Sequence, residues 1–178
     1  MNKKLKRGFI QIYTGNGKGK TTAAIGQAVR AAGAGLKSYI LQLMKEFPYS
    51  ELESLKKLSD LITIEQVGND KFVYKKEKPS NAEIEKVKHS LNKVKEKMLS
   101  GQYDIIILDE ICVSIYFGLV TTKDVLFLID QKPPNIELIL TGRYCPEELI
   151  EKADLVTEMT EIKHYYQKGI STRKGIES

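Results

Sequence analysis

The residues with the clearest chemical use form one run near the start of the chain, Thr14-Gly15-Asn16-Gly17-Lys18-Gly19-Lys20-Thr21-Thr22. The glycines allow backbone N–H groups to point into a shared concavity, because no Cβ atom stands in the way. The run follows a predicted strand and opens a predicted helix, whose N-terminus adds the positive end of its dipole. These features predict a P-loop, a backbone cradle for phosphate groups.

The side chains of this run have separate expected roles. Lys20 would contact phosphate oxygens as a point charge, Thr21 would place its hydroxyl on Mg²⁺, and Thr22 would lie near the phosphates. Lys18 is either a further phosphate contact or a solvated side chain. The general pattern G-x-x-x-x-G-K-[ST] begins with glycine where this chain has Thr14. We expect the two glycines that follow it to supply the flexibility instead.

Two further candidate groups follow apolar runs that predict buried strands. Asp109 and Glu110 end the run 105–110, and Arg143 follows the run 136–142. Ligands of parallel α/β sheets bind beyond the carboxyl ends of the strands, so these side chains are expected at one site. Either carboxylate would hold Mg²⁺, directly or through water. Arg143 would pair with phosphate charge.

Composition limits the class of protein. With 178 residues, 42% of them hydrophobic and 29% charged, the chain predicts one globular domain over residues 1–178. It has no apolar run long enough to span a membrane and no signal-peptide pattern. Cys112, Cys145, His89 and His164 match no disulfide or zinc spacing, so we expect a cytoplasmic protein without a metal scaffold. The net charge of +5 suits an anionic ligand without identifying it.

Strands and helices alternate along the chain, which predicts a three-layer α/β fold with a mostly parallel sheet. A basic arm at 1–7 and an irregular surface tail at 160–178 flank the domain. The expected strands are 8–14, 38–44, 61–67, 105–110, 136–142 and 154–159. The expected helices are 19–32, 50–59, 80–100, 122–131 and 146–152.

The motifs together resemble those of one enzyme family. TGNGKGKTTAA after a strand is followed by QLMK at 42–45, ILDE at 107–110, TGR at 141–143 and ADLVTEM at 153–159. This series resembles the ATP:corrinoid adenosyltransferases, and the Thr before GNGKGKTT is part of the likeness. The resemblance implies a RecA-like P-loop NTPase fold and transfer of the 5′-deoxyadenosyl group of ATP to the reduced cobalt of a corrinoid, with triphosphate as the leaving group.

The resemblance also implies roles for particular residues. Lys20, Glu110 and Arg143 would be catalytic, with Glu110 positioning the nucleotide or metal rather than activating water. The family has an aromatic pair, often with Trp, near the lower face of the corrinoid. This chain has no Trp, and Phe72 and Tyr74 are its nearest candidates. ATP and a corrinoid would be the substrates, Mg²⁺ the cofactor, a reductase the source of reduced cobalt, and a homodimer the assembly.

Two alternative functions share the P-loop. One is a P-loop kinase or ATPase, which would release ADP or phosphate rather than triphosphate. The other is a nucleic-acid-binding ATPase of RecA type, suggested by the basic arm and the lysine-rich segment 71–97. The chain lacks an evident aromatic-plus-basic element for binding a strand, so we do not expect nucleic acid as a partner.

Overall fold

The strands form one parallel sheet at the centre of the molecule. The computed structural model describes residues 4–45, 49–68 and 78–177. The sheet order is β3-β2-β4-β5-β1-β6, and each pair of neighbouring strands is parallel. The strands are β1 (Ile10–Thr14), β2 (Ser38–Leu43), β3 (Ile62–Val67), β4 (Ile105–Asp109), β5 (Glu137–Thr141) and β6 (Leu155–Glu158).

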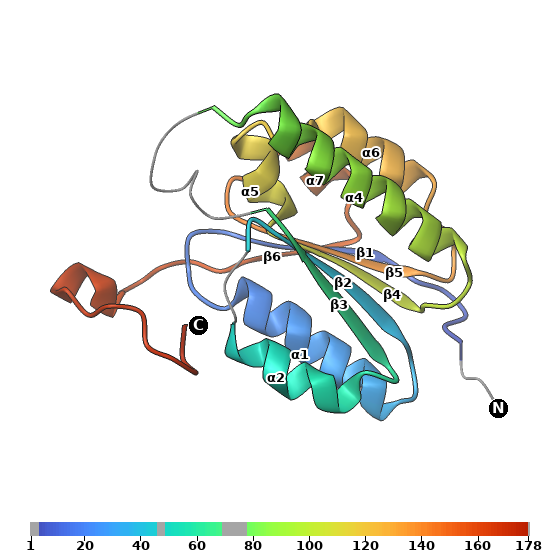
Figure 1. Cartoon of the computed structure of the whole chain (residues 1–178), viewed down its shortest axis with the longest axis horizontal. Coiled ribbons are helices and arrows are strands. Elements are labelled where there is room, and N and C mark those ends of the chain that lie inside the picture. Colours follow the sequence, from blue (N-terminus) through green and yellow to red (C-terminus); the bar gives the residue numbers. More distant parts are fainter. Residues whose placement is uncertain (1–3, 46–48, 69–77, 178) are drawn as a thin grey trace.

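Helices cover both faces of this sheet (Figure 1). The first face carries α1 (Lys20–Gly33) and α2 (Ser50–Leu55), which continues as the 3-10 helix η1 (Lys56–Leu58). The other face carries α4 (Asn81–Leu99), α5 (Ile111–Tyr116), α6 (Thr122–Asp130) and α7 (Glu147–Lys152). A second 3-10 helix, η2 (Tyr165–Lys168), lies in the C-terminal tail. The prediction of a three-layer α/β fold is confirmed.

The core consists of two apolar layers, one on each side of the sheet. On one side Ala24, Ala28 and Ala31 of α1 pack against the sheet, and their small side chains allow the helix to lie close to it. On the other side α4, α6 and α7 contribute larger side chains. Strand β4 belongs to both layers, because its successive residues point to opposite faces. This double burial explains its unbroken apolar run.

Local signals fixed the starts of two helices. Ser80 accepts a hydrogen bond from the backbone N–H of Glu83, and the Glu83 side chain accepts one from the backbone N–H of Ser80, so α4 begins with a capping box. Thr121 and Asp124 make the same arrangement at α6. The expected helix over 50–59 is correct in position but is divided between α2 and η1.

Helix α5 was not predicted. It has six residues, and it is preceded by Glu110, whose φ of 63° is left-handed and whose side chain makes no cap hydrogen bond. A helix this short shows no full apolar period, and its start lacks the usual capping residues. The chain therefore turns into α5 directly after the predicted carboxylate pair.

The two ends of the chain differ in what they contact. In the basic arm, Lys4 donates a hydrogen bond to the carbonyl of Gly101. The tail is largely exposed, as expected, but it folds back so that Lys18 of the P-loop donates to the carbonyl of Ile176 at 2.9 Å (Figure 1). Within the described ranges, the helices are all too short or too polar to cross a bilayer.

Two glycines, one in a tightly packed position and one in an open position, allow a test of the packing. A Cβ on Gly8 would lie 2.2 Å from the backbone carbonyl of Ile136, whereas a Cβ on Gly26, inside α1, would meet nothing within 4 Å. We expect Gly8→Ala to lower the free energy of unfolding by about 1–3 kcal/mol through overpacking. Gly26→Ala should raise it by about 0.5–1 kcal/mol, because alanine is the better helix former. Urea denaturation measures both, and equal effects of the two variants would contradict the packing described.

Candidate functional site

The carboxyl ends of the strands meet at a cavity of about 880 Å³. Its wall includes the P-loop residues from Gly17 to Thr22, together with Glu110 and Arg143. These residues come from three separate segments of the chain, and the sequence predicted that they would share a site. Thr14, Gly15, Asn16 and Asp109 lie outside the lining, with Thr14 ending β1 and Asp109 ending β4. Further lining residues are Met44, Lys45, Tyr49, Lys78, Val113, Tyr116, Phe117, Tyr144, His164, Ile176 and Glu177.

The P-loop is braced by the chain that follows β6. Thr14 accepts a hydrogen bond from the N–H of Met159, and the N–H of Gly17 donates to the carbonyl of Met159 at 2.6 Å. A Cβ atom on Gly15 would lie 2.5 Å from that carbonyl oxygen, and one on Gly17 would lie 2.7 Å from it. Gly15 also has a φ of +91°. Glycine at both positions is therefore required by close backbone approach as well as by the shape of a phosphate cradle.

The ammonium group of Lys20 is held inside the loop. Its Nζ donates to the carbonyls of Gly15 and Gly17, each at 2.7 Å. Burial lowers the pKa of Lys20 and outweighs the opposing effect of the Glu110 carboxylate. A cation with little water around it is stabilised by an approaching anion. Lys20 is thus positioned to act on a phosphate group at the mouth of the loop.

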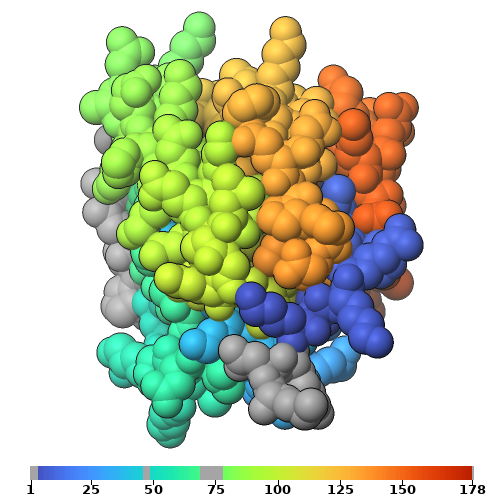
Figure 2. All heavy atoms as spheres, turned by 90° about the vertical axis from the view of Figure 1, so that its right-hand side faces the viewer, coloured from blue at the N-terminus to red at the C-terminus, as the bar shows by residue number. Residues whose placement is uncertain are grey.

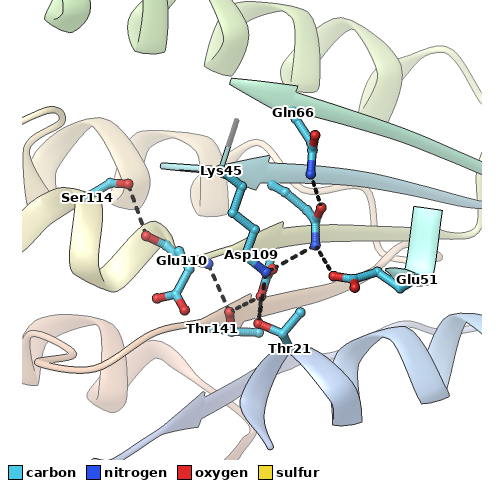
Figure 3. Close-up of polar contacts among 9 residues, drawn as sticks. Thr21, Lys45, Glu51, Gln66, Asp109, Glu110, Ser114 and Thr141 are labelled. Carbon is cyan, nitrogen blue, oxygen red and sulfur yellow. Dashed lines mark hydrogen bonds and ion pairs between the residues drawn. The ribbon is translucent and has the colours of Figure 1, made fainter. Parts of the chain in front are cut away.

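Asp109 is the centre of a buried hydrogen-bond network (Figure 3). Its Oδ1 accepts from the hydroxyls of Thr21 at 2.9 Å and Thr141 at 2.7 Å. Its Oδ2 accepts from Lys45 at 2.7 Å and from Gln42 at 3.2 Å. The residue is only 1% exposed, so these four donors replace the water that a carboxylate would otherwise bind. The network ties the first turn of α1 to the ends of β2, β4 and β5.

Lys45 is a site residue that the sequence analysis did not single out for a role. It follows β2, lines the cavity and forms an ion pair with Asp109 at 2.7 Å. Burial alone would lower the pKa of Lys45, but the charge and hydrogen bond of Asp109 more than offset this effect, and the net pKa is raised. Lys45 therefore stays protonated. Its place in QLMK, at the end of a predicted strand, was the available signal.

Glu110 presents the carboxylate that faces the cavity. Its left-handed backbone is supported by a hydrogen bond from its N–H to Thr141, and its carbonyl accepts from Ser114 (Figure 3). Burial raises the pKa of Glu110, the negative charge of Asp109 adds to this effect, and neighbouring cations oppose it. The two adjacent carboxylates therefore differ in environment. Asp109 is fully paired inside the protein, whereas Glu110 is available to a ligand.

The position of Arg143 in the cavity wall depends on a tight backbone contact at the preceding residue, Gly142. A Cβ atom on Gly142 would lie 2.9 Å from the backbone nitrogen of Val113, and its φ is +137°. Only glycine allows the loop after β5 to pack against the start of α5 in this way. That packing places Arg143 and Glu110 in the wall of one cavity, as the sequence predicted.

Aromatic side chains line the same cavity at positions that the sequence analysis did not identify, Tyr116, Phe117 and Tyr144. The predicted pair, Phe72 and Tyr74, lies outside the described residues. The missed residues come from the unpredicted helix α5 and from the loop after β5. Proximity in the fold, rather than any motif, brings them together.

The histidines and cysteines show no sign of a metal centre. His89 is exposed on α4, while His164 borders the cavity and accepts a hydrogen bond from the N–H of Tyr166. Cys112 and Cys145 are both free. Among the described residues, no three His, Cys, Asp or Glu side chains are grouped so as to hold a metal ion.

A second hollow, of about 420 Å³, lies at the opposite edge of the sheet. It is lined by residues that precede β2, β3 and β4, including Lys37, Leu61 and Asp104, and by Lys4 of the arm. Figure 2 shows this side of the molecule, where residues 4–7 of the arm are drawn in blue. The hollow contains neither the P-loop nor the residues beyond the carboxyl ends of the strands, so the larger cavity is the candidate site.

A glycine-rich loop between the first strand and helix, with Lys20 and Thr21 at its end, defines this molecule as a P-loop protein of the α/β class. Residues 6–178 match the family model described as ATP:corrinoid adenosyltransferase BtuR/CobO/CobP. The chain belongs to this family, which confirms the resemblance read from its motifs.

Curated relatives cover nearly the whole chain. Corrinoid adenosyltransferase of Escherichia coli strain K12 is 31% identical over 173 residues, which are 97% of this chain and 86% of that protein. Corrinoid adenosyltransferase CobA of Salmonella typhimurium is 29% identical over the same shares of both chains. The crystal structure of flagellar accessory protein FlaH from Methanocaldococcus jannaschii aligns with a TM-score of 0.61 over 86% of this chain and 72% of that one. Its sequence identity is 17%, so this likeness shows the fold alone.

The raised pKa of Glu110 gives a test of the site electrostatics. The folded chain holds the Glu110 proton more tightly than the unfolded chain, so this group lowers stability as the pH rises above about 4. Glu110→Gln carries no such charge. We expect the stability of wild type relative to Glu110→Gln to fall as the pH is raised from about 4 to 8. Urea denaturation across this range, with Glu148→Gln at an exposed position of α7 as the control, measures the difference. A difference that does not change with pH would contradict the assignment.

Proposed function

We propose that this chain transfers the 5′-deoxyadenosyl group of ATP to the reduced cobalt of a corrinoid, cobalamin or a precursor, and releases triphosphate. The observation that carries the proposal is one cavity in which the P-loop, Lys20, Lys45, Arg143 and Glu110 meet. Membership of the ATP:corrinoid adenosyltransferase family supports the choice of this reaction among those that P-loops serve.

The chemistry suits the residues of the cavity. Cobalt(I) supplies the electron pair of the new cobalt–carbon bond at C5′ of ATP, while the C5′–oxygen bond breaks and its electrons leave with triphosphate. Since cobalt(I) is itself a strong nucleophile, the protein needs no nucleophilic side chain and no general base. The protein's part is to align the two substrates and to stabilise the charge on the leaving group.

The cavity residues divide this work between them. Lys20 and the amides of the P-loop would hold the triphosphate, with Lys18 and Thr22 as further contacts. Arg143 would add a second positive charge on the leaving group. Glu110 would position the nucleotide or its metal ion, because its carboxylate faces the cavity while Asp109 is fully paired.

We infer Mg²⁺ as the cofactor, and the donor set fits it. The hydroxyl of Thr21 and the carboxylate of Glu110 are hard oxygen donors of the kind that Mg²⁺ prefers. Asp109 would act on the ion through Thr21 or through water, because its own oxygens are already paired. Substrate phosphates and water would complete the shell without a protein cage. Thr21 donates its proton to Asp109 at 2.9 Å and accepts from Lys45 at 3.3 Å, which leaves one oxygen lone pair for a cation. When bound, Mg²⁺ would neutralise part of the triphosphate charge.

The proposal extends to partners. A reductase would supply reduced cobalt, and the enzyme would be a homodimer in the cytoplasm, as the resemblance implies. The two free cysteines suit a reducing compartment. Neither a membrane nor nucleic acid is needed for this activity.

The direct test is anaerobic incubation of the protein with MgATP and chemically reduced cobalamin. We expect a light-sensitive cobalt–carbon product, followed by absorbance, and triphosphate in equal amount. Formation of ADP or free phosphate without adenosylcobalamin would favour the kinase or ATPase alternative. ATP turnover that requires added single-stranded nucleic acid, with affinity falling steeply as salt rises, would favour the RecA-type alternative.

Removal of the P-loop lysine tests the phosphate site. We expect Lys20→Ala to lower the rate of adenosyl transfer by about 100-fold to 1000-fold, the usual cost of losing one transition-state charge contact. The fold should persist, as judged by circular dichroism. Lys57→Ala, at an exposed position outside the cavity, is the matched control and should keep full activity. Equal activity of the two variants would overturn the role given to Lys20.

A further inference from the structure

Two tyrosines form an unusual surface at the rim of the cavity. Tyr116 ends α5, and Tyr144 lies in the loop after β5, next to Arg143. Their rings stack with centroids 4.2 Å apart and an angle of 28° between planes. Although both line the cavity, Tyr116 is 61% exposed and Tyr144 is 52% exposed. They form an uncharged aromatic surface beside a strongly charged site.

The backbone of Tyr144 is held in a conformation that bulky residues avoid. Its φ is +59°, in the left-handed region that favours glycine. A side chain that stays half exposed recovers little from burial, so packing inside the fold does not explain a tyrosine here. Strained residues of this kind cluster at active sites and ligand clamps.

The pair is also fixed in place before any ligand arrives. Tyr116 packs edge to face against Phe117, with centroids 5.2 Å apart, and Phe117 packs against the core. The close contact between Gly142 and Val113 joins the loop that carries Tyr144 to the helix that carries Tyr116. A preformed aromatic surface loses little entropy when it binds a ligand.

The reaction geometry identifies which substrate meets this surface. Triphosphate bound at Lys20 lies at the floor of the cavity, since Lys20 is only 6% exposed. The nucleophile must approach C5′ from the side opposite to the leaving triphosphate, so the corrinoid occupies the outer part of the cavity. Half-exposed side chains at the rim lie in that outer part.

We propose that the stacked Tyr116–Tyr144 pair is a docking surface for the corrinoid, an inference that rests on the proposed function. The chemistry matches, because a corrinoid is an apolar macrocycle with amide side chains at its edge. Tyrosine offers an apolar ring together with a hydroxyl that bonds to amides. ATP is a polyanion, and the cations deeper in the cavity suit it better than an uncharged pair does.

The test separates binding of the two substrates. Hydroxocobalamin, which does not react with ATP, is titrated into wild type and into the Tyr116→Ala/Tyr144→Ala double variant, and MgATP is titrated separately. We expect the Kd for hydroxocobalamin to rise about tenfold or more and the Kd for MgATP to stay within about twofold. Phe127→Ala is the matched control, since Phe127 is an aromatic residue 64% exposed on α6 and outside the cavity.

A second variant separates loss of corrinoid binding from loss of folding. Tyr144→Gly removes the ring and relieves the left-handed strain, so its Tm should equal or exceed that of wild type while its Kd for hydroxocobalamin rises. An unchanged Kd for hydroxocobalamin in the double variant would overturn the proposal. A rise in the Kd for MgATP alone would also overturn it and assign the pair to the adenine base.

Wild type itself shows whether the underlying function holds. If wild type forms adenosylcobalamin and the double variant binds hydroxocobalamin equally well, only the role of the tyrosines fails. If wild type binds MgATP but neither binds nor adenosylates cobalamin, the proposed function fails and the docking surface fails with it.

Discussion

The buried carboxylate of Asp109 is the group on which the rest of the site depends. It receives donors from Thr21 at the start of α1, Thr141 at the end of β5, and Gln42 and Lys45 at the end of β2. An ionised carboxylate without water is costly unless its oxygens are satisfied. Loss of any donor would leave part of the charge unpaired, so the network selects one arrangement of three strand ends and one helix start. The P-loop and the cavity wall are positioned by that arrangement.

Close backbone contacts at three glycines position the parts of the site that the Asp109 network does not reach. Met159, just beyond β6, presses against Gly15 and Gly17, and Val113 of α5 presses against Gly142. The first contact shapes the phosphate cradle from outside, and the second places Arg143 in the wall of the same cavity. The glycines of the sequence motif therefore serve the tertiary fold as well as the ligand. Thr14 fits in place of the first glycine of the pattern, because that residue belongs to β1, has no left-handed backbone and bonds to Met159 through its carbonyl.

The sequence predicted the parts of the site that local patterns encode. Alternating strands and helices, with chemistry at strand ends, were enough to bring Lys20, Glu110 and Arg143 into one cavity. Lys45 also follows a predicted strand, but its ion pair with Asp109 depends on β2 lying beside β4 in a register that pairs Gln42 with Asp109. Local motifs report neither that strand order nor that register. The aromatic rim was missed for a related reason, because Tyr116 belongs to a helix too short to show a period.

The charges of the cavity favour one type of ligand. Asp109 and Lys45 neutralise each other inside the protein. The other charged side chains of the lining are Lys18, Lys20, Lys78, Arg143, Glu110 and Glu177, so cations outnumber carboxylates. Burial lowers the pKa of Lys20 and raises the pKa of Glu110, so each ion is destabilised by the water it has lost. A bound polyanion would stabilise the charged form of Lys20, and a bound cation would stabilise the charged form of Glu110. Because a single charged ligand would relieve only one of the two, the site is best satisfied by a polyanion that brings its own cation, which is the form in which a nucleotide binds with Mg²⁺.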